Sequence, residues 1–261
     1  MMLRFAANLT MLYTEYPLFE RFDRAAAAGF TAVEFFFPYG EPAEKYLDAL
    51  KRNHQELVLF NLPLGDWDAG DRGFAAQPGR RDEFRTAVAQ AVAYGKALRP
   101  PRINCPSGPA AQGQAPYPTL VDNMTYAANA LKDIGIQLVV EPINTNDVPG
   151  AVISSVQAAV DLFDQVDSDN IAVQYDVYHS VRAGEDPFKI IPAFIDRIAH
   201  IQISDVPGRH QIGTGAVDFE KLFTLLDNSG YDGWVSLEYH PQGATDASFN
   251  QLRQMGLLRR E

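Results

Sequence analysis

Four oxygen-bearing side chains interrupt apolar segments at the points where these segments end. They are Glu141, Asp176, Gln202 and Glu238, separated in turn by 35, 26 and 36 residues. Three carboxylates that meet in a partly buried site repel one another, so they need protons or a cation to coexist. An all-oxygen ligand set favours Mg²⁺ or Mn²⁺ over zinc or copper. We therefore predict a divalent metal site at these four residues. The alternative is that the acids cap helices or lie solvated on loops.

Groups that could bind or protonate a substrate follow the same segments. His179 comes three residues after Asp176, and Arg182 follows it. Histidine is the side chain most easily poised near neutral pH, so His179 could act on a substrate rather than only in packing. Arg209 lies after the apolar segment that contains Gln202, where it offers a second positive charge or is simply a solvated loop residue.

An amide and a long loop follow the third apolar segment. Asn61 ends this segment, and the loop over residues 65–78 carries Trp67, Arg72 and Phe74. A loop of this length beside an active face is either a lid over the site or a packed surface loop. The sequence leaves both interpretations open.

The elements that must position these residues alternate between two kinds. Strand candidates are Leu3–Leu9, Ala32–Phe37, Leu57–Leu62, Arg102–Cys105, Gln137–Glu141, Ile171–Tyr175, His200–Ser204 and Trp234–Tyr239. Helix candidates are Pro17–Ala28, Pro42–Asn53, Arg81–Leu98, Thr119–Asp133, Ser154–Val166, Pro187–Asp196, Asp218–Ser229 and Thr245–Leu257. Strands that alternate with helices imply a parallel sheet. Eight such units favour an α/β fold that is a single (β/α)8 TIM barrel domain over residues 1–261.

A barrel of this kind collects its chemistry at the C-terminal ends of the strands. Each interval between the four predicted ligands is roughly one strand–helix unit, so they can meet at one mouth. The alternative fold is an open, doubly wound sheet. It is disfavoured because residues 8–11, after the first strand, hold no glycine-rich phosphate fingerprint.

Composition excludes several classes of protein. The chain has 22 Lys and Arg against 33 Asp and Glu, and a net charge of −11 disfavours nucleic-acid binding. A hydrophobic content of 46% is too high for a disordered chain. The single cysteine, Cys105, cannot form an internal disulfide. No signal peptide or membrane span is apparent, so we expect a cytoplasmic protein, with a homo-oligomer left open.

An ordered set of motifs resembles one enzyme family over nearly the whole chain, the hydroxypyruvate isomerase family of the xylose isomerase-like (endonuclease IV-like) barrels. The motifs are Arg4–Leu9, Gly29–Phe30, Val33–Phe35, Phe37–Tyr39, Asn61–Pro63, Gly65–Trp67, Pro78–Arg80, Glu141–Asn144, Gln174–Asp176, Tyr178–His179 and Glu238–Tyr239.

The resemblance implies interconversion of hydroxypyruvate and tartronate semialdehyde, a small anionic hydroxy-oxo acid. It implies that Glu141 and Glu238 transfer the proton, and that both bind metal together with Asp176 and Gln202. It also implies substrate contacts from His179 and Arg209. The remaining predicted substrate-binding residues are Asn61, Arg182 and His240. An arginine or a protonated histidine would pair with the substrate carboxylate.

Three features depart from the resembling families: Gln202, His240 and the pair Gln211–Ile212. Sugar epimerases of this superfamily place a histidine where this chain has Gln202, which argues against an epimerase and for a harder metal. The isomerases usually have a lysine where His240 stands, and Glu-Pro where Gln211 and Ile212 stand. His240 could replace the lysine charge only when it is protonated.

Other activities remain open. A 2-oxo-tetronate isomerase acts on a substrate one carbon longer, a difference that sequence alone does not resolve. A more remote alternative is a keto-inositol dehydratase-like lyase. A repair endonuclease is disfavoured by the net charge and by a content of only five histidines. A non-catalytic sugar-acid binding protein is disfavoured because paired buried carboxylates are costly without a chemical role.

Overall fold

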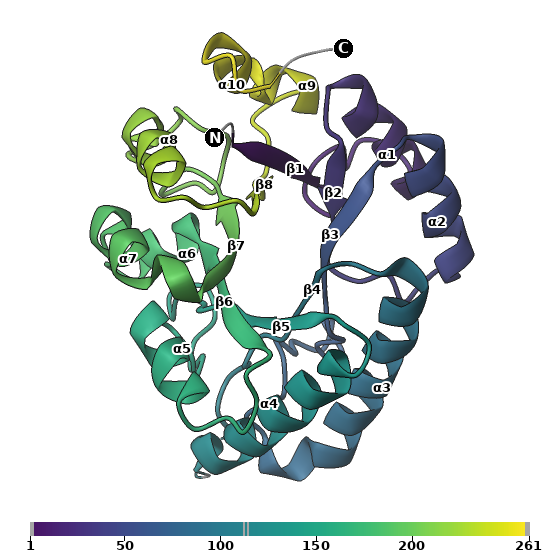
Figure 1. The fold of residues 1–261 in the computed structure, drawn as a ribbon, viewed down its shortest axis with the longest axis vertical. Helices are drawn as coiled ribbons and strands as arrows, with labels where there is room; N and C mark the ends of the chain where they lie inside the picture. Colours follow the sequence, from purple (N-terminus) through teal and green to yellow (C-terminus); the bar gives the residue numbers. More distant parts are fainter. Residues whose placement is uncertain (1–2, 112, 114, 259–261) are drawn as a thin grey trace.

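The computed structural model describes residues 3–111, 113 and 115–258. Within these residues, eight parallel strands form a closed barrel in sequence order, and β8 pairs with β1 (Figure 1). The predicted TIM barrel is therefore confirmed. The strands are β1 (Arg4–Asn8), β2 (Ala32–Glu34), β3 (Glu56–Asn61), β4 (Arg102–Asn104), β5 (Gln137–Val140), β6 (Ile171–Asp176), β7 (Ile198–Ile203) and β8 (Trp234–Leu237).

Helices surround this barrel on its outside (Figure 1). They are α1 (Leu18–Ala27), α2 (Ala43–Arg52), α3 (Arg81–Leu98), α4 (Pro116–Lys132), α5 (Val156–Phe163), α6 (Val177–Arg182), α7 (Pro187–Phe194), α8 (Phe219–Asn228), α9 (Thr245–Ser248) and α10 (Asn250–Gln254). Two 3₁₀ turns, η1 (Pro78–Arg80) and η2 (Ile195–Arg197), precede α3 and β7. None of the described helices is both long and apolar enough to cross a lipid bilayer.

Capping side chains mark the starts of α5, α6, α7 and α8. The Ser155 side chain accepts a hydrogen bond from the Ala158 amide at the start of α5, at 3.2 Å. Asp218 does the same for α8, accepting from the Lys221 amide at 3.0 Å. Such bonds satisfy amides that have no partner within the helix, so these polar residues set where each helix begins.

The sequence prediction missed one helix, α6, which begins directly after β6. Asp176 caps it by accepting a hydrogen bond from the Tyr178 amide at 2.8 Å. The helix is too short to show an apolar period, which is why the pattern did not reveal it. The predicted last helix is divided into α9 and α10 around Phe249.

Strand alternation delivers the polar residues to the inside of the barrel. One cluster of buried apolar side chains contains strand residues but no helix residues, and it includes Ala6, Ala32 and Val139. Successive residues of a strand point to opposite faces, so the residue two positions further on shares the inner face. That residue is Asn8 after Ala6, Glu34 after Ala32 and Glu141 after Val139. The same alternation thus leads from an apolar layer to a polar layer at the mouth.

Candidate active site

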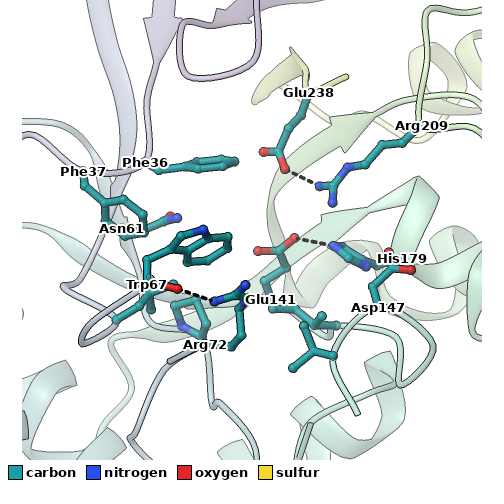
Figure 2. A pocket seen from close by; sticks show the side chains of 14 residues that line it. Phe36, Phe37, Asn61, Trp67, Arg72, Glu141, Asp147, His179, Arg209 and Glu238 are labelled. Atoms are coloured by element: carbon teal, nitrogen blue, oxygen red, sulfur yellow. Dashed lines mark hydrogen bonds and ion pairs between the residues drawn. The ribbon is translucent and has the colours of Figure 1, made fainter. Parts of the chain in front are cut away.

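The C-terminal end of every barrel strand contributes a polar side chain to the mouth. All are buried: Asn8, Glu34, Asn61, Asn104, Glu141, Asp176, Gln202 and Glu238. A cavity of about 260 Å³ opens above this layer (Figure 2). Its lining contains Phe36, Phe37, Asn61, Leu64, Trp67, Arg72, Pro106, Glu141, Ile143, Asp147, Val148, His179, Arg209 and Glu238.

Five of the predicted site residues line this cavity: Glu141, Glu238, Asn61, His179 and Arg209. Asp176 and Gln202 belong to the buried layer beside it, where their strands place them opposite each other. The strand ends therefore bring together all four predicted metal ligands and Asn61, and the segments that follow β6 and β7 add His179 and Arg209.

Glu141 and Asp176 are carboxyl groups that the site makes hard to ionise. Burial, followed by the charge of Asp176, raises the pKa of Glu141 to about 8. Burial raises the pKa of Asp176 to about 6, although Arg209 and backbone amides act in the opposite direction. A carboxyl group that titrates near neutrality can both accept and donate a proton at working pH, as acid–base catalysis requires.

Arg209 links the carboxylates on the opposite side of the site. Its guanidinium donates to Asp176 at 3.1 Å and to Glu238 at 2.5 Å. Its backbone has φ +54°, a left-handed conformation that an arginine rarely adopts and that surrounding contacts must hold. The pKa of Glu238 is nevertheless raised well above its ordinary value, because burial and the other carboxylates outweigh Arg209.

Gln202 connects the polar layer at the mouth to a buried Glu34–His200 pair. Its amide nitrogen donates to Glu34 at 2.8 Å and also to Glu238, while its oxygen accepts from Gln174 at 2.7 Å. Glu34 pairs with His200 at 2.7 Å, and both side chains are fully buried. Burial acts to raise the pKa of Glu34, but His200 and the amide donors outweigh it and lower that pKa. Glu34 therefore remains ionised and orients Gln202.

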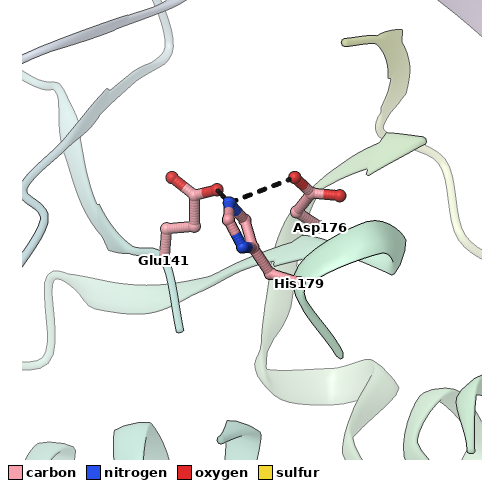
Figure 3. A group of neighbouring side chains, drawn as sticks. All are labelled: Glu141, Asp176 and His179. Carbon is pink, nitrogen blue, oxygen red and sulfur yellow. Dashed lines mark ion pairs between the residues drawn. The ribbon is translucent and has the colours of Figure 1, made fainter. Parts of the chain in front are cut away.

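Asn144 fixes the tautomer of His179. The Asn144 side-chain oxygen accepts from the backbone amides of Asn146 and Asp147, at 3.1 and 3.0 Å. Its NH₂ group therefore faces Nδ1 of His179, 2.7 Å away, and this ring nitrogen must accept. The proton of the neutral ring is then on Nε2, which faces Glu141 at 3.6 Å (Figure 3). Burial and then Arg209 lower the pKa of His179 well below its ordinary value, so the ring is a neutral N–H donor.

A divalent cation fits the donor set of this mouth. Glu141, Asp176 and His179 hold potential ligand atoms within 4.8 Å of one another (Figure 3). A cation would relieve the mutual repulsion that raises the pKa values of the carboxyl groups. His179 is disfavoured as a ligand, because Asn144 places its proton on the nitrogen that faces the carboxylates. Glu141 and Asp176 are then the oxygen donors of this group, and Glu238 is linked to Asp176 through Arg209.

Gln202 presents its nitrogen, not its oxygen, to the carboxylates. It could offer its oxygen to a cation only if its amide rotated together with that of Gln174. The buried oxygen of Gln174 has no hydrogen-bond partner within the described residues, so it could accept from the rotated Gln202. The rotation would end the hydrogen bond to Glu34. The structure therefore favours carboxylate oxygens over Gln202 as donors for a cation.

The two other predicted substrate contacts do not reach the cavity lining. Arg182 lies at the end of α6 and approaches Asp147 at 3.8 Å. His240 is an exposed residue whose backbone amide donates to the Arg209 carbonyl at 2.9 Å. Burial and then Arg209 lower the pKa of His240, so it does not supply the positive charge of a lysine at neutral pH.

The loop over residues 65–78 contributes two residues to the cavity. Trp67 and Arg72 line it, whereas Phe74 is buried against Phe84 with ring centroids 6.2 Å apart. The loop is therefore part pocket wall and part core.

Sequence reasoning missed three amides and an acid of the site. Asn8 donates to Glu238 at 3.1 Å, and Asn104 donates to Glu141 at 3.2 Å. These two residues and Glu34 end β1, β4 and β2, so the strand-end rule that selected the late strands would also have selected them. Asn144 carried no such signal, because its role depends on the turn that follows β5.

The fold and this mouth define a barrel of known family. The family model described as "Xylose isomerase-like TIM barrel" matches residues 22–255, and the chain belongs to this family. It is 44% identical to hydroxypyruvate isomerase of Escherichia coli (strain K12), covering 94% of this chain and 96% of that protein. It is 39% identical to 2-oxo-tetronate isomerase of Cupriavidus necator, covering 96% and 97%. The resemblance to hydroxypyruvate isomerases seen in the sequence is thus confirmed.

Solved structures share the fold. A Brucella melitensis protein described as AP endonuclease, family 2 superposes with a TM-score of 0.93 at 40% identity, covering 97% of this chain and 99% of that one. D-allulose 3-epimerase from Methylomonas sp., in complex with D-allulose, gives a TM-score of 0.74 at 20% identity, covering 97% and 89%. The second likeness concerns the fold alone.

Proposed function

We propose that the protein interconverts hydroxypyruvate and tartronate semialdehyde (2-hydroxy-3-oxopropanoate). The observation that carries this proposal is a pair of buried carboxyl groups with raised pKa values, Glu141 and Glu238, on one small cavity. The 44% identity to a protein named hydroxypyruvate isomerase supports the choice of substrate.

The proposed chemistry moves one proton between adjacent carbons. One carboxylate takes a proton from C3 of hydroxypyruvate, and the electron pair forms an enediolate. The other carboxyl group, in its acid form, delivers a proton to C2, and the proton of the C3 hydroxyl passes to the C2 oxygen. These transfers leave an aldehyde at C3 and a hydroxyl at C2. Glu141 suits this exchange because its pKa is raised to about 8, and the pKa of Glu238 is raised in the same direction, which favours its acid form. His179 offers its Nε2–H to an oxygen of the substrate.

We further propose that Mg²⁺ or Mn²⁺ is the cofactor, held by Glu141, Asp176 and Glu238. Such an ion would polarise the substrate carbonyl and stabilise the enediolate. Arg209 already occupies one oxygen each of Asp176 and Glu238, so it competes with the ion for these two groups.

The test is turnover of hydroxypyruvate in D₂O by the Mg²⁺-loaded protein, followed by NMR. We expect tartronate semialdehyde to form without a redox cofactor. Glu141→Gln and Glu238→Gln should each lower kcat by at least about 100-fold, the contribution typical of a positioned acid or base. Glu44→Gln, an exposed carboxyl group on α2, is the matched control. Near-normal kcat in either active-site variant, with metal still bound, would remove that residue from the proton-transfer pair.

A second candidate is isomerisation of a 2-oxo-tetronate, one carbon longer. The 39% identity to a protein with that name favours including it. Competition between the two substrates in one reaction decides between them. A higher kcat/KM for the four-carbon acid would replace hydroxypyruvate as the preferred substrate.

A further inference from the structure

The proposed substrate carries a carboxylate, and a barrel mouth rich in acids must hold this anion somewhere. Among the described residues that line the cavity, only Arg72, Arg209 and His179 can carry a positive charge. Arg209 is already engaged by Asp176 and Glu238. Both ring nitrogens of His179 already face partners, Nδ1 the side-chain amide of Asn144 at 2.7 Å and Nε2 the carboxyl group of Glu141 at 3.6 Å. Arg72 is therefore the cation that the catalytic acids leave free.

Arg72 is held in place by uncharged partners. Its Nη1 donates to the backbone carbonyls of Asp71 and Trp67, at 2.7 and 3.2 Å. Its guanidinium stacks on the Trp67 ring at 3.6 Å from the centroid. Within the described residues, no carboxylate forms an ion pair with it, and no residue accepts a hydrogen bond from its Nε or Nη2. A planar guanidinium with an open edge is suited to bind a carboxylate through two parallel hydrogen bonds.

The loop that carries Arg72 is anchored on both sides of it. Asp71 forms a two-point ion pair with Arg80, with distances of 2.7 and 2.8 Å, and accepts from the Asp66 amide at 2.9 Å. On the other side, Gly73 packs against Gly108, where an added Cβ would lie 2.0 Å from the Gly73 carbonyl oxygen. The guanidinium therefore needs little ordering when a ligand arrives, which reduces the entropic cost of binding.

Arg72 also lies on the correct side of the cavity. Figure 2 shows Trp67 and Arg72 across the cavity from His179 and Arg209. A three-carbon acid with its carboxylate on this wall can direct its other two carbons toward the Glu141 and Glu238 side. We propose that Arg72, supported by Trp67, is the residue that binds the substrate carboxylate and so selects oxo acids over neutral ketoses. This inference rests on the proposed function for the identity of the substrate.

The kinetic test compares charged and neutral substrates of similar size. Arg72→Met should raise KM for hydroxypyruvate by about 10- to 100-fold, the range for loss of a charged hydrogen-bond partner. The turnover of dihydroxyacetone, in which a hydroxymethyl group replaces the carboxylate, should be unchanged. Arg72→Lys should recover part of the loss, because it keeps the charge but not the two-point geometry. An equal loss for both substrates, or an unchanged KM for hydroxypyruvate, would overturn the proposal.

A matched control is Arg85→Met. Arg85 on α3 is exposed and stacks on Tyr126 of α4 at 4.4 Å from the ring centroid, so it shares the arginine–aromatic contact but lies outside the cavity lining. Its substitution should leave both substrates unaffected. If Arg72→Met does not fold, as judged by its urea unfolding midpoint, Arg72→Gln is the second neutral variant.

A binding experiment separates this inference from the proposed function. Pyruvate has the carboxylate and ketone but no C3 hydroxyl, so it cannot isomerise, and hydroxyacetone is its neutral counterpart. Calorimetric titration of the Mg²⁺-loaded protein should show that Arg72→Met weakens pyruvate binding at least tenfold and leaves hydroxyacetone unchanged. This result would support the carboxylate site even if hydroxypyruvate were not turned over. Equal pyruvate binding by wild type and variant, or none by wild type, would overturn it.

Discussion

Without divalent metal ions, we expect the folded protein to lose stability as pH rises from 6.5 to 8. The cause is Glu141, whose burial raises its pKa from 4.5 to about 8. In this window the folded state holds a proton on Glu141 that the unfolded chain has already released. The free energy of unfolding then falls with pH by about 1.4 kcal/mol per unit for one proton. Near pH 8 the folded state also begins to release this proton, so the slope becomes smaller there. Glu141 alone therefore lowers the free energy of unfolding by about 2 kcal/mol across the window.

The window is chosen to isolate this proton. Below pH 6.5 the lowered pKa of His179 acts in the opposite direction, since the unfolded chain binds a proton that the folded ring does not. Asp176, with a pKa raised to about 6, is mostly ionised above pH 6.5. Glu238 has a raised pKa and adds to the loss in the same direction.

The measurement is urea unfolding in the presence of a chelator at several pH values between 6.5 and 8. Glu141→Gln should reduce the fall of the unfolding free energy with pH by the amount that one proton contributes, whereas Glu44→Gln should keep the wild-type fall. Saturating Mg²⁺ should abolish the loss, because the ion favours the ionised carboxylates. Wild-type stability that stays constant or rises across the window, or a Glu141→Gln variant with the full slope, would refute the electrostatic account.

Two further predictions concern the turn after β5 and the anchored loop. Asn144→Leu should lower kcat about tenfold or more, because it removes the amide that keeps the proton on Nε2 of His179. ¹⁵N NMR of the imidazole ring should then show the change of tautomer. An unchanged tautomer would contradict the role given to Asn144. Gly108→Ala should destabilise the fold by about 2–4 kcal/mol in urea unfolding, because its Cβ meets the Gly73 carbonyl and its φ is +70°. A loss below about 0.5 kcal/mol would mean that the two loops separate easily.

The sequence predicted the barrel and the side of it that holds the chemistry. Both follow from short-range rules: apolar strands alternate with capped helices, and inner positions recur every second residue. The same rules bring Glu141, Asp176, Gln202 and Glu238 to one mouth, because each is placed by its own strand. The roles of these residues, the metal and the extent of the domain stay predictions that the experiments above test.

What the sequence could not give depends on contacts between separate loops. From the sequence we expect Arg182 to bind substrate, but it ends α6, which Asp176 caps, and it approaches Asp147 of the cavity lining without lining the cavity itself. Arg72 is held by backbone carbonyls and the Trp67 ring of its own loop, and this loop is in turn held against the loop after β4, where Gly73 packs on Gly108. Neither effect has a period or a motif that sequence reasoning can detect.

The crossing of Gly73 and Gly108 has a consequence for how this pocket could be redesigned. Because no side chain fits between the two backbones, the loops after β3 and β4 must keep their approach if either changes length. Variation is therefore confined to the tip between Gly65 and Gly73, which carries Trp67 and Arg72. An engineer who wants a longer acid accepted should randomise or extend this tip, because insertions at the crossing would separate the loops that hold the pocket wall.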